Sequence, residues 1–128
     1  MNDFDVTLFA RYGVATVYEA AGRIGLVDVP LTQIVAGSRV AGPARTVRCG
    51  QGDNLMVHAA LASVQPGEVL VLTMPEPEPV ALVGELLATQ AQVHQVAALL
   101  IDASVRDIEE LQALGLQPSR MWEDWAAK

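Results

Sequence analysis

Two short, unbroken apolar runs constrain the fold of this chain more than any other feature. Val69–Leu72 and Val96–Ile101 have the composition of strands that are buried on both faces of a sheet. Segments with helical spacing follow them, at Leu82–His94 and Asp107–Leu114, and a third helix is expected at Asn54–Val64. Strands that alternate with helices in this way predict an α/β fold, layered around a mainly parallel central sheet.

The other elements are predicted from turn residues and spacing. Val6 to about Gly22 has apolar residues at helical intervals, and glycines mark its end. Arg39–Cys49 alternates loosely and predicts one or two strands, interrupted at Gly42-Pro43. Asp53 is placed to cap the helix that follows it.

The last part of the chain gives two further expectations. Gly115 and Pro118 are expected to stop the Asp107–Leu114 helix. Trp122 and Trp125 are three residues apart, which predicts the apolar side of a short terminal helix or an anchor at an interface.

Length and composition limit the classes of function. The chain has 128 residues, and we expect residues 1–128 to form a single domain. Fifteen acidic against eight basic residues give a net charge of −7, and the arginines are scattered, so direct nucleic-acid binding is not expected. Hydrophobic residues make up 52% of the chain, which indicates that some surface is buried between subunits of a homo-oligomer.

Location and redox state follow from what the sequence lacks. The longest apolar run, Val96–Ile101, is too short to cross a bilayer, so no membrane association is expected. Met1–Asp5 is acidic and has no secretory pattern, which predicts a cytoplasmic protein. Cys49 is alone, so neither an internal disulfide nor a thiolate metal cluster is expected.

Two segments at predicted strand-to-helix junctions carry residues suited to chemistry. Gly84–Leu87 lies near a helix start, where glycine allows close approach and free N–H groups can hold a carboxylate or phosphate. Arg106 and Asp107 follow the second buried strand. There the arginine can clamp a substrate carboxylate while the aspartate holds a divalent cation.

Each of these signals also has a purely structural explanation. Asp107 with Glu110 three residues later matches a helix capping box. Arg106 is equally consistent with a surface arginine, and Glu85 with a solvated acid in the first turn of a helix.

Several other chemistries are disfavoured. Lys128 is the only lysine, which argues against Schiff-base catalysis. His58 and His94 are isolated in sequence, as expected of helix-face residues rather than zinc ligands, although His58 lies only five residues after Asp53. Ser104 has no base near it in sequence and is a remote candidate for a nucleophile.

The candidate segments together resemble a known family. Gly84–Thr89 and Ile101–Asp107 resemble the RraA-like family, which contains the regulator of ribonuclease activity A and the class II 4-hydroxy-4-methyl-2-oxoglutarate aldolases. That family carries an acid, twenty intervening residues and then Arg-Asp, and Glu85 and Arg106 are separated by twenty residues here. Further similar segments are Ala15–Ala20, Val40–Ala44, Gly52–Leu55 with His58, and Pro66–Leu70.

The resemblance implies a fold and a set of roles. The expected fold is a swivelling β/β/α layered domain in a trimeric or hexameric ring, with active sites between subunits. Asp107 would help to bind Mg²⁺ or Mn²⁺, and Arg106 would contact a small 2-oxo acid. The backbone amides of Glu85, Leu86 and Leu87 would receive its carboxylate, beside Gly84, and Glu85 would lie near a water that carries protons.

The implied reaction is C–C bond cleavage in pyruvate-derived 2-oxo acids. A divalent ion chelated by the acid stabilises the enolate that cleavage leaves, by several kcal/mol. The same electron sink serves an aldolase and an oxaloacetate decarboxylase, and we expect one or both activities. The alternatives are a non-catalytic RraA-like regulator that binds a ribonuclease, or a degenerate member that keeps only the fold. Methyltransferase activity is not predicted, because no segment resembles a nucleoside-cofactor loop.

Three departures from the family pattern stand out. Glu85 occupies a position where aspartate is usual, and Pro75–Pro79 replaces a glycine-rich loop before the helix. The resemblance covers about Val14 to Gly115, so the chain reads as a C-terminally shortened member. A shortened sheet predicts either replacement of the missing strands by partners or an exposed edge that promotes assembly.

Overall fold

The structure is a computed structural model, and it describes residues 5–115 and 117–120. Most of its strands form one five-stranded sheet with the order β1-β7-β5-β3-β2. β2 (Ala44–Arg48), β3 (Val69–Thr73), β5 (Ala98–Ile101) and β7 (Gln117–Arg120) are parallel, whereas β1 (Thr32–Gln33) pairs antiparallel with β7. The predicted α/β fold with a mainly parallel sheet is therefore confirmed.

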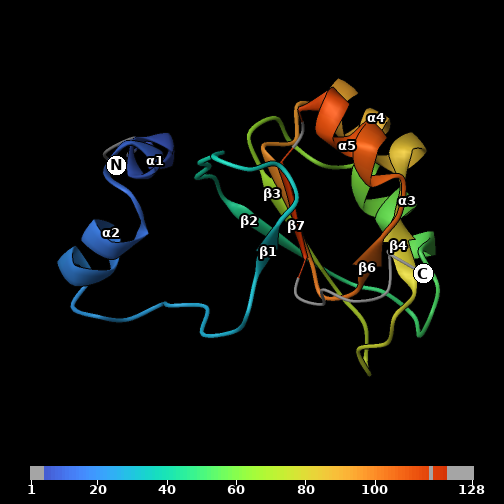
Figure 1. Ribbon diagram of the computed structural model, residues 1–128, viewed down its shortest axis with the longest axis horizontal. Helices are drawn as coiled ribbons and strands as arrows, with labels where there is room; N and C mark the ends of the chain where they lie inside the picture. The colour runs from blue at the N-terminus through green and yellow to red at the C-terminus, as the bar shows by residue number, and fades with distance from the viewer. Residues whose placement is uncertain (1–4, 116, 121–128) are drawn as a thin grey trace.

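A second, two-stranded sheet accompanies the helices. β4 (Ala81–Val83) pairs in parallel with β6 (Ser104–Val105). Figure 1 shows this pair beside α3 (Leu55–Leu61), α4 (Glu85–Val93) and α5 (Ile108–Leu114), which are grouped on one side of the main sheet. We call residues 32–115 and 117–120, which contain both sheets and these helices, the body.

The core of the body is built from the predicted apolar runs. Leu70, Leu72 and Ile101 are fully buried in β3 and β5, and Leu111 of α5 is fully buried against them in the same cluster. Burial of this kind contributes about 25 cal/mol per Å² of apolar surface and stabilises the three helices on the sheet.

The N-terminal segment is organised differently from the prediction. The single helix expected over Val6 to about Gly22 is wrong: a 3₁₀ turn (Val6–Leu8) leads into α1 (Phe9–Tyr12), and α2 (Val14–Ala20) follows. The break falls at Gly13, whose φ of 81° is open to glycine but strained for other residues. Figure 1 shows this segment standing apart from α3–α5. We call residues 5–31 the arm.

Other boundaries differ because they depend on distant partners. The predicted helix at Leu82–His94 is shorter, because Leu82 and Val83 belong to β4. α3 ends at Leu61 rather than Val64, and Asp53 accepts a hydrogen bond from Leu55 N (2.9 Å) although the N-cap position is Asn54. β1, β6 and β7 were not predicted. Gly115 does end α5, but Pro118 lies in β7, and Trp122 and Trp125 lie outside the described residues.

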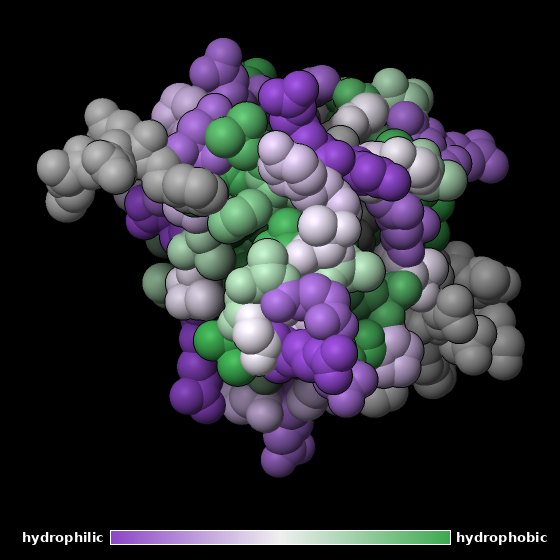
Figure 2. Space-filling model, turned by 90° about the vertical axis from the view of Figure 1, so that its left-hand side faces the viewer, coloured by the Kyte–Doolittle hydropathy of each residue, from purple (hydrophilic) through white to green (hydrophobic). Residues whose placement is uncertain are grey.

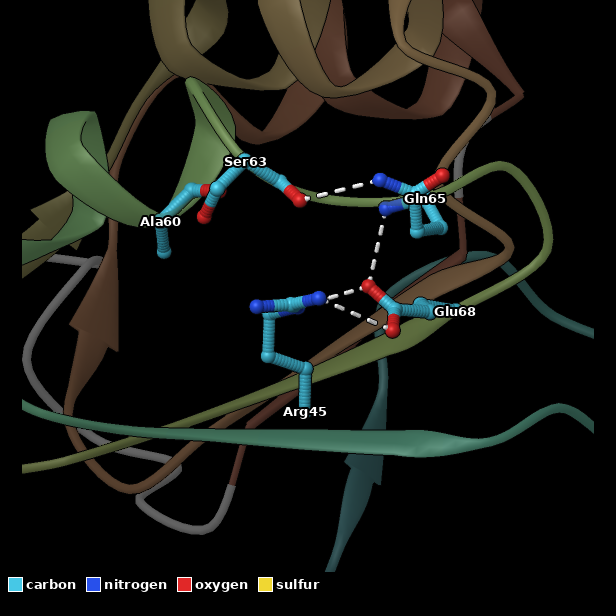
Figure 3. A network of polar contacts seen from close by, with 5 residues as sticks. All are labelled: Arg45, Ala60, Ser63, Gln65 and Glu68. Atoms are coloured by element: carbon cyan, nitrogen blue, oxygen red, sulfur yellow. Dashed lines mark hydrogen bonds and ion pairs between the residues drawn. The ribbon is translucent and has the colours of Figure 1, made fainter.

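A polar network ties the edge strand β2 to the start of β3 (Figure 3). Arg45 Nε and Nη2 donate to the two carboxylate oxygens of Glu68, at 2.6 and 3.1 Å, and Gln65 N donates to Glu68 Oε2 at 2.9 Å. These bonds lower the pKa of Glu68, and the same carboxylate raises the pKa of Arg45. None of the helices in the described part of the chain has both the length and the apolarity that a membrane crossing needs.

Candidate active site

The two predicted candidate segments meet at one place in the fold. Gly84 follows β4 and is the N-cap of α4, whereas Arg106 and Asp107 follow β6 and lead into α5. Because β4 and β6 are parallel neighbours, both segments leave the small sheet at the same edge. Arg106 N donates to Val83 O at 3.0 Å, and Glu85 N donates to Asp107 Oδ2 at 3.0 Å.

Gly84 is where the two segments are in closest contact. It is buried, and a Cβ atom at this position would lie 2.6 Å from Asp107 Oδ2 and 2.7 Å from Arg106 Nε. Both distances are shorter than real Cβ contacts. A larger residue at this position would therefore force the Arg106 and Asp107 side chains to move.

Asp107 does not act as the helix cap that its spacing allowed. It occupies the N-cap position of α5, but its side chain makes no capping hydrogen bond. Its carboxylate binds the start of α4 instead, through Glu85 N, so the capping-box alternative does not describe its main contact. The backbone of Asp107 is left-handed (φ 58°, ψ 46°), a conformation that aspartate tolerates better than most residues and that is often found at functional sites.

The charges at this junction are largely accessible. Arg106 Nε lies 3.7 Å from Asp107 Oδ2, and the two side chains are 71% and 39% exposed. An exposed pair of this kind contributes little to stability, roughly 0–1 kcal/mol. Both groups are therefore available to a ligand at small energetic cost.

Two depressions flank Arg106. One, of about 430 Å³, is lined by Arg106, Asp107, Glu109 and Glu110 together with Ser104 and four apolar residues. The other, of about 230 Å³, is lined by Arg106, by Asn54 and His58 of the α3 region, and by the first turn of α4. The lining of the larger depression therefore includes three carboxylates. The lining of the smaller one includes no carboxylate, but it has three side chains that can donate hydrogen bonds.

Sequence reasoning did not assign Asn54 and His58 to the candidate site. Their position follows from the packing of α3 against α4, which brings them to Arg106. The available signal was the Gly52–Leu55 segment with His58, which was recognised as similar to the family but given no role.

The predicted carboxylate-binding amides are only partly free. Glu85 N–H already donates to Asp107, so the amides of Leu86 and Leu87 are the ones left in the first turn of α4, where intrahelical acceptors are absent. The side chains of Glu85 and Leu86 are exposed, and that of Leu87 is buried.

Comparison with known proteins assigns the chain to a family. The family model "RraA-like: Aldolase/RraA" matches residues 14–119. The chain belongs to the RraA-like family. The resemblance predicted from Gly84–Thr89 and Ile101–Asp107 is confirmed.

The relatives of this RraA-like protein carry different names. A Halalkalibacterium halodurans protein, provisionally named a 4-hydroxy-4-methyl-2-oxoglutarate aldolase, is 28% identical over 109 residues, which are 85% of this chain and 52% of that protein. The RraA-like chain thus spans about half the length of this curated relative.

Two solved structures share the RraA-like fold. A Geobacillus kaustophilus protein described as an S-adenosylmethionine:2-dimethylmenaquinone methyltransferase is 27% identical, with a TM-score of 0.73 over 84% of this chain and 66% of its own. The RNA-processing inhibitor RraA from Thermus thermophilis has a TM-score of 0.76 at 24% identity, over 85% and 66% of the two chains. The second likeness supports the fold alone.

The residues of this RraA-like site fit a water-rich divalent cation. Asp107 Oδ2 is engaged by Glu85 N, while Oδ1 has no hydrogen bond to any residue that the structure describes. Within the described ranges, no three His, Cys, Asp or Glu side chains lie close enough together to hold one metal ion, so a cage made wholly of protein ligands is not formed there. Mg²⁺ retains several waters and is commonly held by one or two carboxylates, which suits Asp107.

Proposed function

We propose that this RraA-like protein is a divalent-metal-dependent lyase that cleaves C–C bonds of pyruvate-derived 2-oxo acids. The candidate activities are a 4-hydroxy-4-methyl-2-oxoglutarate aldolase and an oxaloacetate decarboxylase. The observation that supports this proposal is the convergence of Arg106, Asp107 and the first turn of α4 around Gly84. Family membership and the aldolase name of the H. halodurans relative are consistent with it.

Asp107 would hold Mg²⁺ or Mn²⁺. When bound, the cation supplies the positive charge that stabilises the electron pair left by C–C cleavage. The bond from Glu85 N–H holds Oδ2 of the Asp107 carboxylate in place, so Oδ1 would be the oxygen left for the ion. The left-handed backbone at Asp107 turns the chain so that this carboxylate points back toward α4 rather than capping α5.

Arg106 and the first turn of α4 would bind the acid. The guanidinium offers several donors in a plane, and the N–H groups of Leu86 and Leu87 add the positive end of the helix dipole. Asn54 and His58 extend this donor-rich wall. This local attraction explains how a protein with a net charge of −7 can hold a dianion.

Glu85 would accept the proton that the reaction releases and then return it to the product. Its side chain is exposed in the first turn of α4, one residue from Gly84. In the aldolase reaction the bond between C3 and C4 breaks, and its electron pair stays with the pyruvate half. The proton of the C4 hydroxyl passes through water to Glu85 and returns to C3 of pyruvate.

A homo-oligomer, trimeric or hexameric as in the resemblance, is part of the proposal. Among the residues that the structure describes, ten of the fourteen exposed large hydrophobic side chains lie between residues 8 and 40, and the other four lie on α3 and at the two ends of α4. Figure 2, seen from the side of the arm, shows apolar surface between hydrophilic residues on this face. Two separate apolar surfaces on one chain suit head-to-tail contact between copies, which closes into a ring when the rotation allows.

The deciding experiment is a pyruvate-release assay with oxaloacetate and with 4-hydroxy-4-methyl-2-oxoglutarate. We expect turnover that requires added Mg²⁺ or Mn²⁺ and stops when a chelator removes it. Turnover without metal would overturn the lyase proposal. Absence of turnover together with capture of a ribonuclease would favour the non-catalytic regulator instead.

Asp107→Asn is the sharpest variant for the metal site. Asparagine tolerates the left-handed backbone and keeps an oxygen for Glu85 N–H, but it loses the charge that holds the cation. We expect turnover to fall roughly a hundredfold or more, with little change in thermal stability. Equal activity of the two proteins would show that Asp107 has a structural role only.

A further inference from the structure

Ser104 is the one buried polar residue among those that the structure describes. It is 4% exposed, and its hydroxyl oxygen has no hydrogen-bond partner within that part of the chain. A buried hydroxyl that bonds to nothing is unfavourable, because it has given up its bonds to water. This position in β6 therefore needs an explanation.

The strand itself does not require the hydroxyl. The backbone of Ser104 is satisfied, since Ser104 N donates to Val80 O at 3.1 Å and the residue pairs with Ala81 of β4. Alanine would keep these backbone interactions, so the pairing of β6 with β4 does not depend on the hydroxyl.

The location of Ser104 points to a ligand. It precedes Arg106 by two residues and lines the same depression of about 430 Å³ as Arg106 and Asp107. Its hydroxyl is shielded in the described conformation, but a serine side chain changes between staggered positions by rotation about a single bond. Such a rotation re-aims the hydroxyl, which can both donate and accept.

We propose that the Ser104 hydroxyl is a substrate-positioning group, which forms its hydrogen bond with an oxygen of a small oxo or hydroxy acid bound beside Arg106. This inference rests on the proposed lyase function, because that function places such an acid beside Arg106, whose side chain lines both this depression and the donor-rich one. The hydroxyl would then lack a partner only in the free protein and would gain one when the acid binds.

Ser104→Ala separates this role from a structural one. Removal of an unpaired hydroxyl should leave the Tm of the free protein unchanged or raise it. The same change should weaken the binding of oxalate, a dicarboxylate probe, about tenfold in the presence of Mg²⁺, as expected for one lost hydrogen bond. Calorimetric titration measures the second effect, and KM for oxaloacetate should rise more than kcat falls.

Ser38→Ala is the matched control. Ser38 Oγ donates to Val35 O at 2.7 Å, far along the chain from Arg106. We expect this variant to lose thermal stability and to keep its oxalate affinity, which is the opposite pattern.

Three results would count against the inference. A lower Tm for Ser104→Ala would reveal a structural partner for the hydroxyl. Unchanged oxalate affinity, in a background where the wild type binds oxalate, would overturn the role of Ser104 while leaving the lyase proposal intact. Failure of the wild type to bind oxalate with Mg²⁺ would overturn both.

Discussion

The body and the arm use apolar residues in opposite ways. In the body, α3, α4 and α5 each bury apolar side chains against the core, including Leu87 and Leu111. In the arm, neither the 3₁₀ turn nor α1 nor α2 has a buried residue, and Tyr12 and Val14 are 63% and 75% exposed. Helices of four and seven residues are too short to be stable alone in water. The body is thus stabilised from within, whereas the helices of the arm bury none of their residues, and the proposed homo-oligomer would supply a surface for them.

The largest expected effect lies in the core of the body. Leu111→Ala removes a fully buried side chain, and we expect the free energy of unfolding to fall by about 3 kcal/mol. Urea denaturation followed by circular dichroism measures this. Leu8→Ala, a leucine of the arm that is 37% exposed, is the matched control. Similar losses in the two variants would contradict the division between body and arm.

The next effect concerns the junction that forms the candidate site. Gly84→Ala places a methyl group 2.6 Å from Asp107 Oδ2, so the Asp107 and Arg106 side chains must move. We expect a loss of about 1–3 kcal/mol in stability and a larger proportional loss of pyruvate release. Gly50→Ala is the control: its new methyl group would make ordinary contacts with Asp53, so we expect it to change neither the stability nor the rate of pyruvate release.

A smaller effect depends on pH and tests the edge strand of the body. Because Arg45 lowers the pKa of folded Glu68, this carboxylate stabilises the protein above the ordinary glutamate pKa of about 4.3, and the contribution is lost as the pH falls below it. The raised pKa of Arg45 keeps the arginine charged throughout this window.

Glu68→Gln should therefore be less stable than the wild type at pH 7, and the difference should shrink on acidification. Unfolding curves at several pH values measure it. Glu19→Gln breaks an exposed pair with Arg23 in the arm and should give only a small difference. If the difference in unfolding free energy between the wild type and Glu68→Gln persisted in acid, the variant would have lost packing and not a charge interaction.

The smallest effect on the unfolding of a single chain is expected in the arm. Tyr12→Ser should change the stability of the isolated protomer by no more than about 0.5 kcal/mol. It should nevertheless weaken self-association, which sedimentation measurements over a range of concentrations detect. A wild-type protein that is monomeric at all concentrations would contradict the contact between copies.

The sequence predicted those elements whose pattern is local. β3 matches the first apolar run with Thr73 added, β5 falls inside the second run, and α5 begins one residue after Asp107 and ends just before Gly115. The convergence of Gly84 with Arg106 and Asp107 was expected from the resemblance and from the rule that sites gather beyond strand ends.

The missed elements depend on partners that local patterns do not show. β1 and β6 contain two residues each, too few for any periodicity, and β4 was merged with the helix that follows it. The direction of the Asp107 side chain was equally out of reach, because the local spacing of Asp107 and Glu110 allows a capping box and gives no sign of a contact with Glu85 N, 22 residues away in sequence. A single helix was predicted from Val6 to about Gly22 because a glycine such as Gly13 is tolerated within a helical pattern. Its positive φ, which breaks the helix, cannot be seen in the sequence.

The position of β7 has a consequence for biosynthesis. β7 is the last of the described strands in chain order, yet it lies between β5 and β1, and β1 pairs with no other described strand of the sheet. While the nascent chain is still on the ribosome, β1 has no partner and the hydrogen-bonding edge of β5 is open to other chains. The parallel core from β2 to β5 can form earlier, but the sheet is completed only when residues 117–120 have emerged.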